Sequence, residues 1–211
     1  MENFKIINYK INLLFLTTVL LTAPLFVYSY SEKTTHPALT QEIIKFYNFN
    51  FPDTKISDKH TEVIIDGSVR EDDGTRWLKH FYDPIHNRGL EMGKSKWPSS
   101  KSWAISEDND YSWDRGIYEY VWGNRIKGLR TLGQILHLLE DSTVPDHTRN
   151  DPHPSISNQG SPYEHWTERF DRKGIEIDLS NAKSITLPIL GNYFDQAARY
   201  SNENFFSKDT I

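Results

Sequence analysis

Apolar residues recur at helical spacing along most of the chain. Leu39, Ile43, Ile44 and Tyr47 fall on one helical face, which predicts a helix over 35–47. The same spacing predicts helical regions over 59–72, 111–143 (with a break near Gly123 or Gly128), 163–170 and 188–206. No segment shows convincing alternation of apolar and polar positions, the pattern of a half-buried strand. The chain is therefore predicted to be all-α, in one compact multi-helix domain.

Capping residues and prolines predict where these helices begin and end. Thr34 precedes Pro37, so we expect a threonine cap with proline in the first turn. Pro145 disfavours helix in the residue before it, so the long helical region should end near Thr143 or Val144. The chain should then turn back toward the helix that it has just left.

The amino terminus has the pattern of a secretory signal peptide. Lys5 and Lys10 precede an apolar run over 11–28, and Val27-Tyr28-Ser29 resembles a cleavage motif. We therefore expect a signal peptide over 1–29, a mature domain over 30–211, and a secreted or extracytoplasmic location. The alternative is an uncleaved membrane anchor, because the run is at the short limit for a span.

Composition and charge narrow the functional classes. The chain of 211 residues is 37% hydrophobic, enough for one domain with a sizeable core. It has no cysteine, so bound metal could supply the stability that disulfides give many exported proteins. The formal net charge of −5 argues against broad capture of nucleic acid, and we expect no stable nucleic-acid complex. Bound divalent cations would add local positive charge, so a nuclease is not excluded.

A polar loop over 88–103 mixes lysines with Trp97 and Trp103. Interleaved basic and aromatic residues can contact a lipid interface or stack on unpaired bases. The alternative is that the tryptophans pack the loop onto the domain, which is their more common role.

The region over 132–153 concentrates potential metal ligands. His137 and Asp141 stand four apart, which places both side chains on one helical face, with Cβ atoms about 5–6 Å apart. His147 and His153 follow at intervals of six residues. Imidazole and carboxylate are what zinc selects when no thiolate is present. Each residue alone could be a hydrogen-bonded core residue, but the clustering favours a metal site.

Three other segments could contribute to the same site. Glu71, Asp72 and Asp73 lie at a helix carboxyl end, where they oppose the helix dipole, so a cation or solvent must compensate them. His80 lies in the string His-Phe-Tyr-Asp-Pro, which suggests a buried, fixed imidazole or a packed structural corner. His36 lies at a helix start, where it either binds metal or caps locally.

Taken in order, these motifs resemble the bacterial zinc-dependent phospholipase C family, whose fold is shared with single-strand-specific fungal nucleases. The resemblance rests on His36, on HFYDP at 80–84 and on the H-x3-D-x5-H spacing over 137–147, and it covers about 34–170. It implies an all-α protein that holds zinc ions in a cleft, two or three Zn²⁺ here, and hydrolyses phosphate esters.

The resemblance also implies a role for individual residues. One zinc would be held by Asp72, His80, His137 and Asp141; a second by Asp141, His36 and the amino group and carbonyl of Tyr30; and a third by His147, His153 and Glu164. Asp72 would also be the catalytic general base. Gly160 stands where the family has its last histidine; His153 is the substitute, and His165 is the rival. Glu164 and His165 are neighbours on a helix and so would diverge.

These observations lead to one main functional expectation and two alternatives. We expect a secreted hydrolase that cleaves phospholipid head groups, with a phospholipid or other phosphodiester as substrate and transient contact with a membrane surface. One alternative is a single-strand nuclease of the same fold. The other is a non-catalytic zinc-binding module, motivated by Tyr30 in place of the family's leading tryptophan, by Gly160 and by the short carboxyl end.

Overall fold

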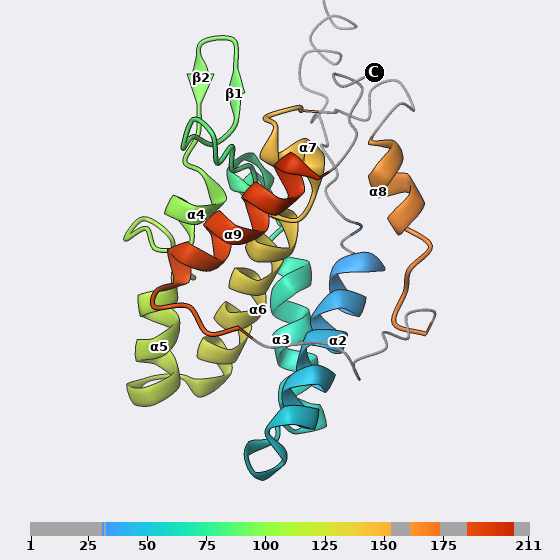
Figure 1. The fold of residues 1–211 in the computed structure, drawn as a ribbon. Helices are drawn as coiled ribbons and strands as arrows, with labels where there is room; N and C mark the ends of the chain where they lie inside the picture. Colours follow the sequence, from blue (N-terminus) through green and yellow to red (C-terminus); the bar gives the residue numbers. More distant parts are fainter. Residues whose placement is uncertain (1–30, 32, 153–160, 174–184, 205–211) are drawn as a thin grey trace, which may run out of the picture.

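Helices make up most of the part of the chain that the structure describes (Figure 1). The structure is a computed structural model, and it describes residues 31, 33–152, 161–173 and 185–204. The helices are α2 (Thr35–Asn50), α3 (Asp58–Arg70), α4 (Ser100–Trp103), α5 (Trp113–Trp122), α6 (Arg125–Asp141), α7 (Pro145–Thr148), α8 (Pro162–Thr167) and α9 (Leu190–Glu203), with short 3-10 turns η1 (Pro52–Thr54) and η2 (Arg76–Lys79). Strands β1 (Glu91–Met92) and β2 (Ser95–Lys96) form a small antiparallel hairpin. The expected all-α class is compatible with this architecture.

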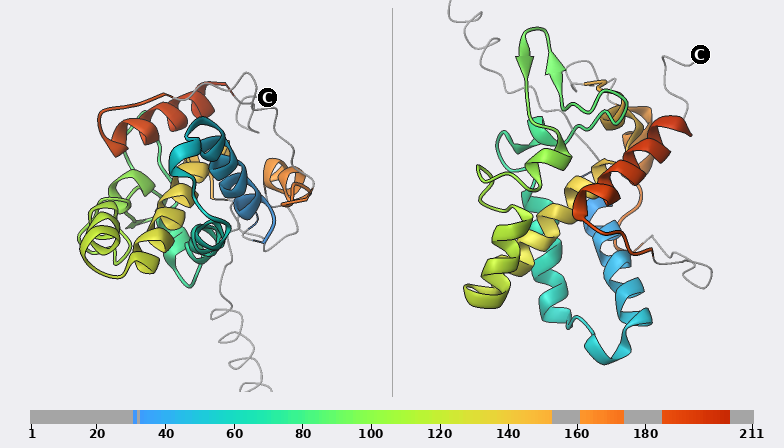
Figure 2. Two further views of the ribbon diagram at one scale, coloured as in Figure 1. Left: turned by 90° about the horizontal axis from the view of Figure 1, so that it is seen from below. Right: turned by 60° about the vertical axis from the view of Figure 1, so that its left-hand side comes forward.

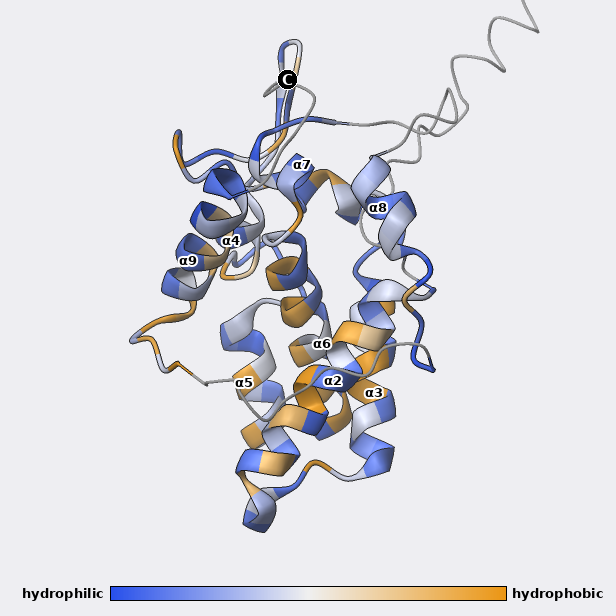
Figure 3. Cartoon of the chain, turned by 45° about the vertical axis from the view of Figure 1, so that its right-hand side comes forward, coloured by the Kyte–Doolittle hydropathy of each residue, from blue (hydrophilic) through white to orange (hydrophobic). Residues whose placement is uncertain are grey.

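Helix α6 lies at the centre of the described fold. It contacts α2, α3, α4, α5 and α9, and both views in Figure 2 show it surrounded by other helices. One side of α6 carries Ile135 and Leu138, which pack in a core cluster with Phe194 of α9. Another side carries Leu129, which packs with Ile44 and Ile64. The apolar segments of α2, α3 and α6 accordingly lie close together in the middle of the molecule (Figure 3).

Two glycines allow α3 and α6 to approach closely. A Cβ atom on Gly133 would lie 1.9 Å from the carbonyl oxygen of Ile64, and one on Gly67 would lie 2.1 Å from that of Arg130. Any other residue would overlap the facing backbone, so the helices must separate if either glycine is replaced. The crossing therefore brings the carboxyl end of α3 against α6 just before His137.

Most predicted helix positions are confirmed, with differences at their ends. The break in the long helical region falls at Gly123, after which the Asn124 side chain caps α6 by accepting from the Lys127 amide. Thr34 is the N-cap residue of α2, as expected, but its side chain makes no capping hydrogen bond. Pro145 does more than stop a helix: it occupies the first turn of α7, where a missing amide donor costs nothing.

The tryptophans of the 88–103 loop pack against the protein. Trp103 is buried in the core cluster with Tyr82, and Trp97 is half-buried against Phe81 and Leu90. Lys79 lies 4.4 Å from the Trp103 ring centroid, a cation–π contact. Packing onto the domain is thus the role that the structure gives these two side chains. Among the described residues, no helix has the length and apolar character needed to cross a membrane.

Candidate metal centre

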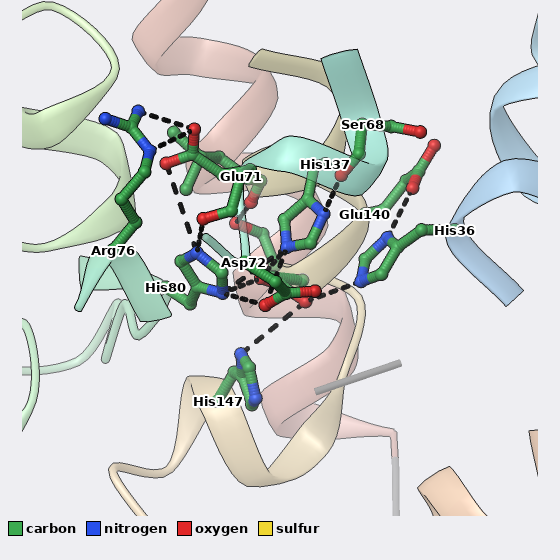
Figure 4. Close-up of polar contacts among 12 residues, drawn as sticks. His36, Ser68, Glu71, Asp72, Arg76, His80, His137, Glu140 and His147 are labelled. Atoms are coloured by element: carbon green, nitrogen blue, oxygen red, sulfur yellow. Dashed lines mark hydrogen bonds and ion pairs between the residues drawn. The ribbon is translucent and has the colours of Figure 1, made fainter. Parts of the chain in front are cut away.

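Imidazoles and carboxylates from six parts of the chain meet beside the carboxyl end of α6, and all but Asp72 are buried. Figure 4 shows the part of this group around Asp72, with His36, His80, His137 and His147. The side chains come from α2 (His36), the turn after α3 (Asp72), the residue after η2 (His80), α6 (His137 and Asp141), α7 (His147) and α8 (Glu164). All seven were predicted from the sequence as ligands. The structure brings every one of them into a single connected group.

Two imidazoles and two carboxylates of this group bring one atom each close to the others. The atoms are His80 Nδ1, His137 Nε2, Asp72 Oδ1 and Asp141 Oδ2. His80 Nδ1 lies 2.9 Å from Asp141 Oδ2, 3.6 Å from Asp72 Oδ1 and 3.3 Å from His137 Nε2. His137 Nε2 lies 3.2 Å from Asp141 Oδ2 and 3.8 Å from Asp72 Oδ1. Ligand atoms about 2.0–2.2 Å from one tetrahedral zinc are about 3.3–3.6 Å apart, so these spacings suit one ion.

Asp141 also faces two further histidines through its second oxygen. Its Oδ1 lies 3.4 Å from His36 Nε2 and 3.7 Å from His147 Nδ1. The His36 and His137 rings stack, with centroids 3.7 Å apart. One carboxylate thus lies between two sets of imidazoles and presents one oxygen to each set.

His147 and Glu164 form the outer part of the group. His147 Nε2 lies 3.5 Å from Glu164 Oε1, and the His147 ring stacks on Phe81 with centroids 4.4 Å apart. Ser161 caps α8 by accepting from the Glu164 amide, and its hydroxyl also hydrogen-bonds the Asp146 carboxylate. These contacts fix α8 against α7, so Glu164 faces His147.

The outward ring nitrogens of two histidines donate to backbone carbonyls. His137 Nδ1 lies 2.6 Å from the Ser68 carbonyl oxygen, and His80 Nε2 lies 3.3 Å from the Glu71 carbonyl oxygen. A carbonyl oxygen can only accept, so these outward nitrogens carry hydrogen. In the neutral rings the inward nitrogens then present lone pairs to carboxylates, and only a proton or a cation between them relieves the repulsion. The donor set therefore fits a metal ion.

The pKa values of these groups also show that the carboxylates favour positive charge on the imidazoles beside them. Burial alone would lower the pKa of His36, but hydrogen bonds to Asp141 and Glu140 raise it to about 10. Burial and His36 would lower the pKa of His137, but Asp141 and Asp72 raise it. Burial would raise the pKa of Asp141, yet the surrounding histidines hold it well below its usual value. Without metal, His36 and His137 therefore hold protons more tightly than free imidazoles do, and a cation would displace these protons.

The three consecutive carboxylates of 71–73 separate into different roles. The sequence left open whether a cation or solvent compensates them. Asp72 faces the inward nitrogens of His80 and His137, Glu71 Oε1 lies 4.0 Å from the outward nitrogen of His80, and Asp73 is 69% exposed. Glu71 is fully buried and pairs with Arg76, whose Nη2 lies 2.6 Å from Glu71 Oε2. Burial raises the pKa of Glu71, and Arg76 opposes that rise. An arginine thus compensates Glu71, which the sequence did not predict.

Two predicted ligands, Tyr30 and His153, lie outside the described residues, as does the predicted signal peptide over 1–29. His165, the rival to His153, is 55% exposed and faces Glu168 at 3.7 Å. It points away from Glu164, as expected for neighbours on a helix. His165 therefore does not join the group.

One carboxylate near the group was not predicted to take part. Glu140 lies next to Asp141 on α6 and is buried, with Oε2 2.6 Å from His36 Nδ1. A charged residue in an otherwise apolar helical stretch was the available signal, because a buried charge needs a partner. Its partner lies 104 residues earlier in the chain, so spacing alone could not identify it.

Comparisons with known proteins do not place the chain in a family: no family model matches it, and none of the curated proteins searched matches it either.

Proposed function

We propose that the protein is a secreted, zinc-dependent hydrolase of phosphate esters that cleaves phospholipid head groups in the manner of the zinc-dependent phospholipase C family. The observation that carries this proposal is the convergence of imidazole and carboxylate atoms: those of Asp72, His80 and His137 lie within 4.8 Å of one another, and so do those of His36, His137 and Asp141. It is supported by the His36 and His147 rings, which face the second oxygen of Asp141.

The ligand chemistry favours zinc over calcium and magnesium. Imidazole nitrogens of four described residues surround Asp141, and one of these rings, His147, also faces Glu164, whereas calcium and magnesium sites use oxygen ligands throughout. Asp72, His80, His137 and Asp141 would hold the first ion. Asp141 would be shared with a second ion at His36, and His147 with Glu164 would hold a third.

Bound zinc supplies Lewis-acid chemistry, polarising phosphoryl oxygens and making a water molecule more acidic. The protein contributes a fixed set of charges and one carboxylate at the edge of the group. The Asp72 side chain is 14% exposed, more than the other ligands of the first group, so solvent reaches it. Asp72 is therefore positioned to orient an attacking water and to accept its proton.

The charge of the chain favours a lipid over a nucleic acid. With a formal net charge of −5, the protein repels a polyanionic strand more than a phosphodiester balanced by a cationic head group. Phosphatidylcholine is such a phosphodiester. Hydrolysis would take place during transient contact with a lipid surface.

The first test is zinc content followed by turnover. Protein beginning at Tyr30 should retain two or three zinc equivalents after exhaustive dialysis and should release diacylglycerol from phosphatidylcholine micelles. Asp72→Asn should reduce turnover by about 10²-fold or more while circular dichroism stays unchanged. Asp73→Asn is the matched control, since its exposed carboxylate lies outside the group.

Three results would contradict the proposal. Digestion of single-stranded DNA without lipid hydrolysis would favour the nuclease. Zinc binding with no turnover of either substrate would favour the non-catalytic module. Absence of bound zinc would reject the metal centre itself.

A further inference from the structure

Glu140 uses both carboxylate oxygens inside the protein. Oε2 lies 2.6 Å from His36 Nδ1, and Oε1 accepts a hydrogen bond of 2.9 Å from the Thr40 hydroxyl. His36 and Thr40 are fully buried in α2, one turn apart, and Glu140 is 5% exposed. The carboxylate thus joins α6 to α2 directly behind the metal centre.

This contact determines which nitrogen of a neutral His36 ring carries the hydrogen and which one presents a lone pair to Asp141. An ionised carboxylate only accepts hydrogen bonds, so the hydrogen of a neutral His36 ring resides on Nδ1. The lone pair then lies on Nε2, which is 3.4 Å from Asp141 Oδ1. The other tautomer would place an N–H group where a metal ion must bind.

His36 differs in this respect from the other two histidines with resolved outward contacts. His137 and His80 donate to the neutral carbonyls of Ser68 and Glu71, whereas His36 donates to a charged group. A carboxylate partner makes the imidazole a stronger ligand than a carbonyl partner does. Loss of the Glu140 charge should therefore lower the metal affinity of the position that includes His36 and leave the affinity of the other positions unchanged.

We propose that Glu140 is a positioning residue that holds His36 in its metal-binding tautomer and strengthens the ion shared by His36 and Asp141. The inference rests on the proposed function, since it requires that the centre bind metal. Glu140 itself does not contact substrate or the reacting atoms. Thr40 in turn fixes the rotation of the Glu140 carboxylate.

Two substitutions separate the charge of Glu140 from its hydrogen bonds. Glu140→Gln keeps an oxygen that accepts from His36 Nδ1 and an amide that donates to Thr40, but it removes the charge. Glu140→Leu removes both. Glu42→Gln is the matched control, because Glu42 is equally buried in α2 but pairs with Lys45 instead of a histidine.

Zinc affinity is measured by competition with a chromophoric chelator, and the His36 tautomer by NMR of ¹⁵N-labelled histidine in the zinc-loaded protein. Glu140→Gln should weaken one zinc equivalent by about tenfold and keep hydrogen on Nδ1. Glu140→Leu should weaken the same equivalent by about 100-fold and abolish the Nδ1–H signal. Glu42→Gln should match the unaltered protein in both measurements.

Unchanged affinity of every zinc equivalent in Glu140→Gln would overturn the inference, and this variant decides alone if the leucine variant does not fold. Equal weakening of all equivalents would also overturn it, because the effect would then be general. If the unaltered protein binds no zinc, the proposed function fails first, and the two failures are thereby distinguished.

Discussion

The His137 Nδ1 atom lies 2.6 Å from the Ser68 carbonyl oxygen, so the central helix is joined to α3 by one of its own candidate ligands. His137 lies one turn after Gly133, and Ser68 follows Gly67, the two glycines at the helix crossing. The distance between α3 and α6 therefore determines whether the imidazole reaches its carbonyl partner. Core packing and ligand orientation depend on the same contact.

Gly133→Ala should destabilise the protein and weaken zinc binding together. Its Cβ would lie 1.9 Å from the Ile64 carbonyl oxygen, which forces the helices apart at a cost of about 3 kcal/mol. Urea denaturation and chelator competition measure the two effects. Gly191→Ala in α9 is the control, because it meets only the flexible end of Lys101 and should change stability by less than about 1 kcal/mol. Equal stabilities of the two variants would contradict the close crossing.

Asp141→Asn should remove more zinc than His147→Ala. Asp141 faces His80 and His137 through one oxygen and His36 through the other, so its loss affects two positions. His147 lies toward Glu164 at the outer part of the group. Elemental analysis should show two equivalents lost in the first variant and one in the second, with helical circular dichroism kept in both. Equal losses would show that Asp141 does not bridge.

The metal-free protein should lose stability as the pH rises from about 6.5 to about 10. The pKa of His36 is raised from 6.5 to about 10 in the folded protein, so the folded state holds its proton more tightly than the unfolded chain. That contribution is fully present below pH 6.5 and is lost as the pH passes 10. Urea midpoints of chelator-treated protein across this range measure it. Zinc affinity should rise over the same range, because the metal competes with the proton. A midpoint that rises with pH would contradict the raised pKa.

Arg76→Met should destabilise the protein by about 3–5 kcal/mol, because it leaves the buried Glu71 carboxylate without its guanidinium partner. Arg76 also donates to Gln134 on α6 and to Asn109, so no single replacement contact suffices. Arg70→Met is the control. Its exposed pair with Asp66 should contribute far less to the free energy of unfolding, because solvent screens it. Thermal or urea denaturation compares the stabilities of the two variants. Similar losses of stability would show that the buried Glu71–Arg76 pair contributes no more than an exposed pair.

The sequence predicted which side chains meet in the candidate metal centre better than it predicted the residues around them. The four-residue spacing of His137 and Asp141 places both on one helical face whatever the tertiary fold, so their proximity could be predicted from spacing alone. Glu71 and Asp72 could not be separated in the same way. They follow the end of α3 at Arg70, and the direction of each carboxylate depends on Arg76 and on the histidines.

Contacts between distant segments could not be predicted either, because they depend on the tertiary fold and not on local spacing. Glu140 and His36 are 104 residues apart, and nothing in local spacing connects them. The helices themselves were easier, because apolar periodicity and Gly123 act locally. The short β1–β2 hairpin carries too few residues for an alternation to be visible.

The single carboxylate of Asp141 faces histidines from four separate parts of the chain, the earliest being His36. An ion shared by His36 and Asp141 would join two segments that lie about 100 residues apart in the sequence. The unfolded chain does not hold these ligands together, so the ion would bind only the folded arrangement and would stabilise it in proportion to metal concentration and affinity. Metal loading would then make α2 and the carboxyl end of α6 separate only in a single step with release of the ion.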